Sequence, residues 1–155
     1  MDAEAGEEAR TLARYGCLAA NTVLVHGVGL CAAWRARVLD AGAGLVWCPS
    51  SNQYLFGSTA DVRAFDDADR LAIGSDSRLS ADGDLLDELR AAHETRQIGH
   101  EGLIRAVTGG PARLLRLAEE AACGPGVRRT SPSSAEGAAT RSIGCRRRTA
   151  RTCAS

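Results

Sequence analysis

Residues that can do acid–base or metal chemistry follow three short apolar runs of this sequence. His26 ends the run 22–25, Ser50, Ser51 and Asn52 follow the run 44–48, and Asp76 and Ser77 follow the run 71–74. In parallel α/β sheets and barrels, side chains at the carboxyl ends of the strands converge on one crevice, so these residues are expected to face one pocket. A His and an Asp placed there can bind a metal, orient a water molecule or form part of a hydrolytic relay. A plainer interpretation stays open for each of them, because a polar residue after a strand often caps the next helix.

The elements that must position these residues alternate along the chain. Helical periodicity predicts helices over residues 3–18, 30–39, 59–69, 85–92, 100–108 and 111–120, with the three apolar runs between the earlier ones as strands. Strands that alternate with helices are typical of βαβ units with a parallel sheet. The predicted fold class is therefore α/β.

Composition narrows the class of protein further. The 155 residues contain 45% hydrophobic but only 4% aromatic side chains, with 19 basic and 19 acidic residues. No run of about 18 apolar residues is present, which excludes a membrane span in this sequence. The first ten residues carry four acids and one arginine, the reverse of a signal sequence, so a cytoplasmic location is predicted.

The six cysteines do not indicate a zinc site. They contain no C-x-x-C pair and have no close histidine partner. Without an export signal, free or buried thiols are expected.

A second motif begins directly after the first candidate residue, His26. Gly27-Val-Gly29-Leu-Cys-Ala32 matches G-x-G-x-x-A between a strand and a helix, the setting in which a dinucleotide pyrophosphate binds. That motif also needs an acid at the end of the next strand, where this sequence has Cys48-Pro49-Ser50. Dinucleotide binding through Gly27 and Gly29 is therefore the weakest of the functional interpretations.

Four stretches taken together resemble the amidohydrolase superfamily, in its branch of cytosine deaminase-like and triazine hydrolase-like enzymes. The stretches are Val23-Leu-Val-His-Gly-Val-Gly-Leu30, Gly44-Leu-Val-Trp-Cys-Pro-Ser-Ser-Asn52, Leu71-Ala-Ile-Gly-Ser-Asp-Ser77 and Asp84-Leu-Leu-Asp-Glu-Leu-Arg-Ala91. Thr108-Gly-Gly-Pro-Ala-Arg113 also resembles the family's helix that leads from the barrel to a small β-domain. Each motif is weak alone, but their order and spacing are specific together.

The resemblance implies the C-terminal part of a (β/α)₈ barrel and a divalent metal, zinc or iron, that activates water for attack on a C–N bond of a small molecule. By position, Asp76 would be the metal ligand and would take the proton of the attacking water. His26 would hydrogen-bond that water and polarise the substrate. Asn52 and Ser77 would lie where the family's loops meet substrate.

The sequence departs from the family pattern at the metal ligands. The family has an H-x-H pair on its first strand and another His on its fifth, whereas this chain has only His26, His93 and His100. His93 and His100 are expected to be solvated, away from strand ends. His26 and Asp76 cannot supply the three protein ligands of a catalytic zinc, and whether the chain is an enzyme by itself stays open.

Length agrees with an incomplete barrel. A complete barrel takes about 250 residues, while the resemblance covers about residues 5–118 and three βα units. The uncovered sheet edges predict a poorly stable monomer and association through those edges.

The last 35 residues differ in composition from the rest. Residues 1–120 hold 12 arginines and 18 acids, whereas residues 121–155 hold 7 arginines and one acid, with Val127 and Ile143 as their only large aliphatic residues. Residues 1–120 are therefore predicted to be the barrel segment and 121–155 a disordered, Arg-rich tail. A shifted reading frame of GC-rich DNA and a true disordered tail both explain this composition. Three consecutive arginines in such a tail are weak grounds for nucleic-acid binding, which is not expected.

Two main functional hypotheses follow. One is a segment of a metal-dependent hydrolase acting on non-peptide C–N bonds, whose own chain lacks activity and whose substrate is a small molecule. The other is a noncatalytic α/β interaction or assembly module.

Overall fold

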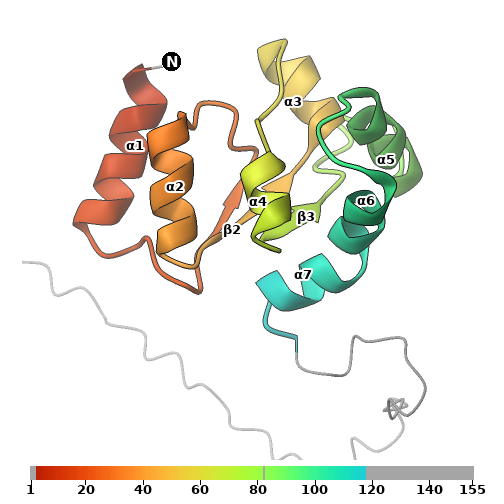
Figure 1. The fold of residues 1–155 in the computed structure, drawn as a ribbon. Coiled ribbons are helices and arrows are strands. Elements are labelled where there is room, and N and C mark those ends of the chain that lie inside the picture. The colour runs from red at the N-terminus through yellow and green to blue at the C-terminus, as the bar shows by residue number, and fades with distance from the viewer. Residues whose placement is uncertain (1–2, 82, 118–155) are drawn as a thin grey trace, which may run out of the picture.

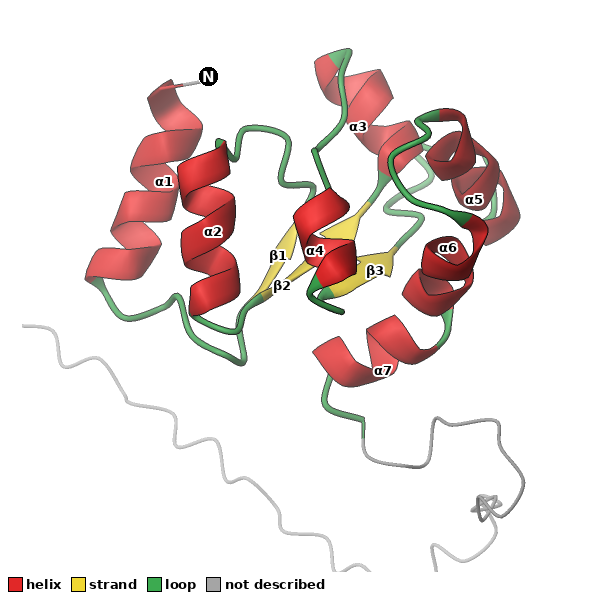
Figure 2. Ribbon diagram, viewed as in Figure 1, coloured by secondary structure: helices red, strands yellow, loops and turns green. Residues whose placement is uncertain are grey.

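The computed structural model describes residues 3–81 and 83–117. Ten elements follow one another along this part of the chain (Figures 1 and 2). They are α1 (Ala3–Arg14), β1 (Val23–Val25), α2 (Ala32–Asp40), β2 (Gly44–Trp47), α3 (Pro49–Phe56), α4 (Arg63–Asp67), β3 (Leu71–Ile73), α5 (Leu85–Glu94), α6 (His100–Val107) and α7 (Gly109–Leu114).

The three strands form one parallel sheet in the order β1-β2-β3. Leu24 of β1 is paired with Leu45 of β2, which is paired with Leu71 of β3. Helices connect the strands, as parallel pairing requires. The predicted α/β class is confirmed.

One face of the sheet carries the hydrophobic core. Because side chains alternate along a strand, Leu45 and Trp47 of β2 point to the same face, and both are fully buried. Helices lie across this face in Figure 1. The core is completed by residues from β3 and the helices and loops around it: Val38, Ala43, Ala60, Val62, Phe65, Leu71, Ile73, Ala92, Ile98, Leu103 and Ala106.

The other face is less well covered. Val25 of β1 is 52% exposed, and its partner Val46 of β2 is only half-buried. Parallel sheets normally have both faces covered, so exposed valines on this face are unusual.

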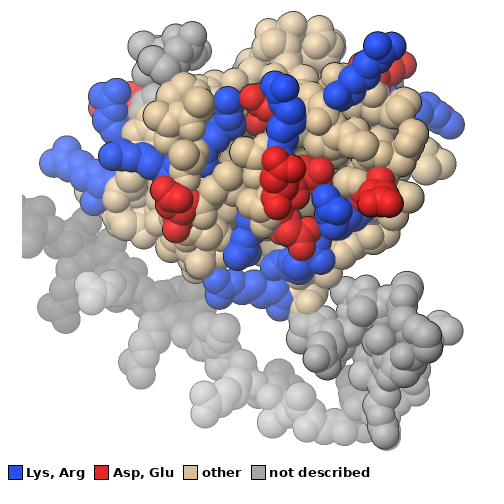
Figure 3. Space-filling view, in the orientation of Figure 1, with Lys and Arg blue, Asp and Glu red and all other residues tan. Residues whose placement is uncertain are grey.

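Arginine–aspartate pairs tie the C-terminal helices to α4. Arg105 of α6 lies 2.6 Å from Asp66 of α4 and 3.3 Å from Asp69, and Arg113 of α7 also pairs with Asp69. Figure 3 shows arginine and acidic side chains next to one another across the middle of the molecular surface that faces the viewer. The pairs hold α4, α6 and α7 in one layer.

Helix ends differ from the sequence-based expectation for local reasons. α1 ends at Arg14 instead of residue 18, because Gly16 adopts φ 69° and closes the helix in the left-handed conformation. α7 ends at Leu114, shortly before Arg116 adopts φ 53°. The helix predicted over 59–69 is only the short α4.

The predicted tail at 121–155 lies outside the described residues, so its predicted disorder remains a prediction. Within residues 3–81 and 83–117, none of the helices has the length and apolar character needed to span a bilayer.

Candidate active site

His26 is placed directly after β1 by an unusual backbone. Its N–H donates to the carbonyl of Val46 at 3.0 Å, which continues the β1–β2 ladder by one residue. His26 and Gly27 then both adopt φ 68°. A left-handed conformation is uncommon for a residue other than glycine, and such residues cluster at functional sites. The turn leaves the imidazole 30% exposed at the carboxyl edge of the sheet.

Asp76 has the same kind of backbone at the end of β3. It adopts φ 55°, and its side chain is 27% exposed. Its Oδ2 accepts hydrogen bonds from the hydroxyl of Ser51 and, at 3.0 Å, from that of Ser80. The Ser51 hydrogen bond is the main cause that holds the pKa of Asp76 below its ordinary value, and Ser80 and nearby His26 contribute. The carboxylate is therefore ionised at neutral pH.

The structure brings these two residues together. His26 Nε2 lies 3.8 Å from Asp76 Oδ2. The two side chains can exchange a proton or share one ligand, because each offers a proton-accepting atom at the same edge of the sheet. The predicted convergence of the first and third strand ends on one place is therefore observed.

The polar residues after β2 lie on a helix that the sequence reasoning missed. The sequence predicts that Pro49 ends a strand, but it is the first residue of α3, where its missing N–H costs nothing. The helix turns Ser51 and Asn52 inward, and both are fully buried. Ser51 donates to Asp76, and Asn52 Oδ1 lies 2.8 Å from His26 Nδ1.

Ser77 and Ser50 lie differently. Ser77 is exposed, and its hydroxyl lies 3.2 Å from that of Ser80. Ser50 contributes its backbone N–H, which donates to Glu88 Oε2 at 3.1 Å. Neither side chain has a recorded hydrogen bond to His26 or Asp76, so a role of Ser77 at the substrate stays a prediction.

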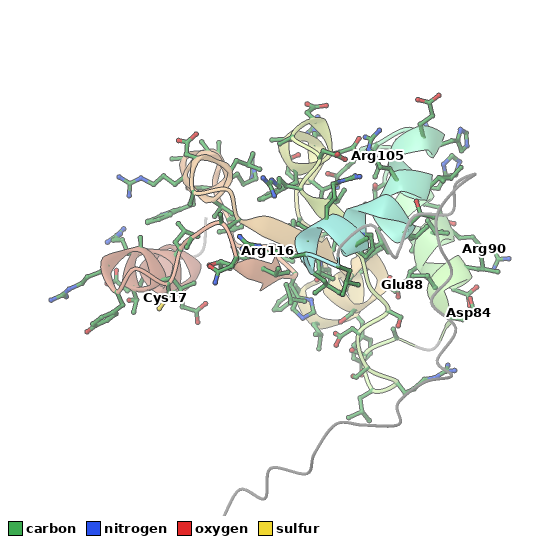
Figure 4. All side chains as sticks on the ribbon, turned by 90° about the horizontal axis from the view of Figure 1, so that it is seen from below. Cys17, Asp84, Glu88, Arg90, Arg105 and Arg116 are labelled. Carbon is green, nitrogen blue, oxygen red and sulfur yellow. The ribbon has the colours of Figure 1, made fainter. Side chains whose placement is uncertain are left out.

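Glu88 was also missed by the sequence reasoning. This residue of α5 is only 1% exposed and accepts a hydrogen bond from the N-terminal turn of α3, where a negative charge is favoured. In Figure 4 it projects inward from α5, whereas Arg90 lies at the outer side. The sequence feature that could have indicated its burial is its position four residues before Ala92, on the same buried side of the helix.

Cys48 lies beneath the site and is 2% exposed. Burial, followed by the negative charges of Asp76 and Glu88, raises its pKa from 9.0 to about 11. The thiol is therefore held neutral at neutral pH.

The donor set does not by itself make a metal centre. A catalytic zinc normally has three protein ligands. Among residues 3–81 and 83–117, no group of three or more His, Cys, Asp and Glu side chains is placed to hold an ion. His26 and Asp76 could contribute to a metal site only together with ligands from elsewhere.

A cleft of about 1010 Å³ opens beside His26. It is lined by α1, the end of β1, the turn at 27–31, the start of α2 and Phe56 of α3. The Phe56 ring meets the imidazole edge to face, with centroids 6.2 Å apart. His26 therefore lines the cleft, and its Nε2 also lies 3.8 Å from Asp76 Oδ2.

Gly27 of the G-x-G-x-x-A motif has a structural role. A Cβ at this position would lie 2.8 Å from Leu45 Cδ1, besides being strained by the positive φ. Core packing thus accounts for Gly27 without a nucleotide.

Comparison with known proteins gives three curated relatives at similar identity, all named as deaminases. The chain is 39% identical over 84 residues to 5-methylthioadenosine/S-adenosylhomocysteine deaminase of Haloquadratum walsbyi, which covers 53% of this chain and 19% of the relative. The protein of that name from Halobacterium salinarum is 39% identical over 79 residues, 50% of this chain and 18% of the relative. Aminodeoxyfutalosine deaminase of Deinococcus radiodurans is 37% identical over 112 residues, 68% of this chain and 26% of the relative.

A solved structure agrees with these relatives. An adenosine deaminase from Xanthomonas campestris with bound zinc superposes with a TM-score of 0.65 and 27% identity, over 72% of this chain and 28% of that one. No family model matches the chain. The chain thus spans only about a fifth to a quarter of the length of the relatives it matches. The deaminase relatives and the shared deaminase fold together confirm the predicted resemblance of this chain to the amidohydrolase superfamily.

Proposed function

We propose that His26 and Asp76 are the proton-handling pair of a metal-dependent deaminase site, in a segment that is one arc of a (β/α)₈ barrel. The observation that carries this proposal is the 3.8 Å separation of His26 Nε2 and Asp76 Oδ2 at the carboxyl edge of the sheet. Catalytic residues of barrel enzymes come from the ends of several strands at this edge.

The parallel sheet supports the barrel as the complete architecture. Its strands are neighbours in sequence order, and helices follow each of them. β1 and β3 each pair with only one strand within the described residues. In a barrel, further strands would pair with both edges and cover the face that carries Val25.

The proposed chemistry divides between the two side chains. Asp76 is ionised at neutral pH and can take the proton of an attacking water or bind a cation. Its Oδ2 already accepts from Ser51 and Ser80, so Oδ1 is the oxygen proposed for that role. His26 Nε2 is proposed to hydrogen-bond the water or the substrate from the other side, within reach of the cleft.

The metal is proposed to need ligands beyond the described residues. Zinc is bound in the adenosine deaminase neighbour, but the side chains described in this chain do not include a three-ligand group. Hydrolysis by this segment alone is therefore not expected, and zinc or iron binding is proposed only for a completed site.

An adenosine-type small molecule is the proposed substrate class. Two relatives are named for 5-methylthioadenosine and S-adenosylhomocysteine, and the structural neighbour for adenosine. Ser77, exposed beside Asp76, is the proposed substrate-contacting residue. A cytoplasmic location and the division into 1–120 and 121–155 are kept as proposals.

A transplant tests the catalytic proposal. The segment of the Xanthomonas campestris adenosine deaminase that aligns with this chain is replaced by the residues of this chain, and ammonia release from adenosine is measured in the zinc-loaded chimera. Activity is expected, and His26→Asn or Asp76→Asn should lower kcat by about 100-fold or more. His93→Asn, an exposed residue of α5, is the matched control and should leave activity unchanged.

A noncatalytic assembly module is the second candidate. It is favoured by the uncovered valine face together with the incomplete ligand set among the described residues. A chimera that folds and binds zinc but releases no ammonia would contradict the deaminase proposal and leave this module as the better one.

A further inference from the structure

A chain of side-chain hydrogen bonds runs from the core to the imidazole of His26. Trp47 Nε1 donates to Thr59 Oγ1 at 2.6 Å. Asn52 Nδ2 donates to the same oxygen at 3.4 Å and to the backbone carbonyl of His26 at 3.3 Å. Asn52 Oδ1 lies 2.8 Å from His26 Nδ1. Trp47 and Asn52 are both fully buried, so water does not compete for these bonds.

The chemistry of the partners sets the direction of each bond. An indole N–H only donates and a backbone carbonyl only accepts, so the amide nitrogen of Asn52 must face the His26 carbonyl. A flipped amide would place two acceptor oxygens against each other. The amide oxygen therefore faces His26 Nδ1, and since it can only accept, Nδ1 must carry a hydrogen.

We propose that Asn52 is a positioning residue that holds neutral His26 in the tautomer with hydrogen on Nδ1. Nε2 then carries no hydrogen and can accept a proton at the edge of the cleft, 3.8 Å from Asp76 Oδ2, because the hydrogen bond at one ring nitrogen determines the state of the other. In the opposite tautomer, Nε2 would carry a hydrogen and could not accept a proton. The inference rests on the proton-handling role proposed above and names the group that makes this role available.

The buried amide changes the interpretation of Asn52. The family resemblance implies a substrate contact for Asn52, and that contact stays a prediction. In this structure its side-chain atoms are engaged by His26 and Thr59, and its exposure is 0%. Thr59 in turn is held by Trp47, which lies on β2. The orientation of the imidazole is thus tied to β2, the middle strand of the sheet.

Nitrogen-15 NMR of the histidine rings tests the inference directly. The full chain is labelled at histidine and recorded at rising pH until the ring signals no longer change. His26 is assigned by its loss in His26→Gln, and the exposed His93 and His100 serve as internal references. His26 is expected to show hydrogen on Nδ1.

Two variants separate positioning from packing. Asn52→Leu removes the acceptor and should shift His26 toward hydrogen on Nε2, the form that free imidazole side chains prefer. Thr59→Val keeps the volume but removes the anchor of the Asn52 amide, and it should give a smaller shift in the same direction. It also keeps the test decisive if Asn52→Leu does not fold.

Specific outcomes overturn the inference. Wild-type His26 with hydrogen on Nε2 would do so, as would a folded Asn52→Leu with the tautomer unchanged. The NMR measurement needs no turnover, so it is independent of the chimera assay. Hydrogen on Nδ1 with an inactive chimera would contradict the deaminase proposal alone, and an active chimera with hydrogen on Nε2 would contradict the positioning role alone.

Discussion

His26 and Asp76 share an uncommon backbone conformation as well as a site. Both adopt positive φ just beyond a strand, and each is then held by buried partners from α3: His26 by Asn52, and Asp76 by Ser51. A strained conformation of this kind persists only where its surroundings over-determine it. The helix α3, between β2 and α4, therefore positions the side chains of both His26 and Asp76.

Removing the Ser51 hydroxyl is expected to raise the pKa of Asp76 toward its ordinary value. Ser51 is the largest cause of the low pKa. A lowered carboxyl pKa contributes stability above the unfolded-state value of about 3.9, and this contribution is lost as pH falls through the folded value. Ser51→Ala should therefore make the stability fall less steeply as the pH is lowered. At neutral pH it should lower the free energy of unfolding by about 1 kcal/mol.

Carbon-detected NMR titration of Asp76 and urea unfolding at several pH values measure both effects. Ser58→Ala is the matched control, because Ser58 is exposed and its hydroxyl contacts only the carbonyl of Phe56. An unchanged Asp76 titration in Ser51→Ala would contradict the assigned cause.

Cys48 is expected to alkylate far more slowly than Cys17. Burial and the nearby acids raise the pKa of Cys48 to about 11, which at pH 8 leaves roughly a hundredfold less thiolate than a pKa of 9.0 would. Cys17 is exposed and lies near the end of α1, on the opposite side of the molecule from Glu88 (Figure 4). Because the raised pKa favours the neutral thiol in the folded state, its contribution to stability is complete below pH 9 and is lost as pH rises through about 11.

Iodoacetamide labelling at pH 8, followed by peptide mass mapping, compares the two thiols within one sample. Rapid labelling of Cys48 in the folded chain would show that it is neither buried nor held neutral. Unfolding in urea should bring its rate close to that of Cys17.

At the scale of elements, α7 packs against β3 through a glycine. A Cβ at Gly110 would lie 2.3 Å from the backbone oxygen of Leu71 and 2.9 Å from that of Arg105. Neither atom is the end of a flexible side chain. The helix can therefore approach the strand closely only with glycine at this position.

Gly110→Ala is expected to lower the free energy of unfolding by about 1–3 kcal/mol, since α7 must move away from the strand. Gly109→Ala is the matched neighbour, because the Cβ there would meet only the end of the Arg113 side chain, at 3.0 Å. Urea unfolding should show a large effect for the first variant and little for the second. Equal effects would point to backbone propensity instead of close packing.

The start of α5 is defined by a reciprocal capping box. Asp84 accepts from the N–H groups of Leu86 and Asp87, and the Asp87 carboxylate accepts from the N–H of Asp84. The last of these bonds is the main cause that lowers the pKa of Asp87. α5 carries Glu88, so its start also determines where the N-terminus of α3 is held.

Asp84→Ala is expected to lower the free energy of unfolding by about 1 kcal/mol, the usual effect of losing an N-cap. Glu94→Ala at the other end of α5 is the control. It should change stability little or increase it slightly, because an acid near a helix C-terminus opposes the helix dipole. Thermal unfolding of both variants measures the difference, and a stability loss in Glu94→Ala as large as that in Asp84→Ala would contradict the capping role.

At the scale of the whole molecule, the sheet leaves an apolar side chain of its edge strand exposed, because Val25 of β1 is 52% accessible. Val25 lies on the strand β1, which pairs only with β2 among the described residues. Unpaired strand edges of this kind promote association. Self-association of the chain through β1 is therefore expected.

Val25→Lys should shift the chain toward the monomer, because a charged edge opposes strand pairing. Leu79→Lys is the control: Leu79 is 89% exposed but lies in the loop after β3, away from the strand. Light scattering over a range of concentrations gives the mass of each variant. An effect of Leu79→Lys equal to that of Val25→Lys would show that general surface charge, and not the strand edge, controls association.

Much of the fold could be predicted from residue order. The three strands and the helices α2, α5 and α6 lie close to their expected positions, because their apolar periodicity is set by local sequence. α3 was missed because Pro49 closes a strand and opens a helix with the same restricted φ, and local sequence alone does not separate these cases.

The candidate site, like the fold, could be predicted from the sequence only in part. Sequence alone determined that His26 and Asp76 follow parallel strands, and parallel strands bring their carboxyl ends to one edge whatever the loops do. Only the tertiary structure decided that Asn52 faces the imidazole instead of the cleft and that Glu88 lies buried under α3. The partners of the first contact are 26 positions apart in the sequence, and those of the second are 38 positions apart. Such pairings depend on how whole helices pack, which no local pattern of residues encodes.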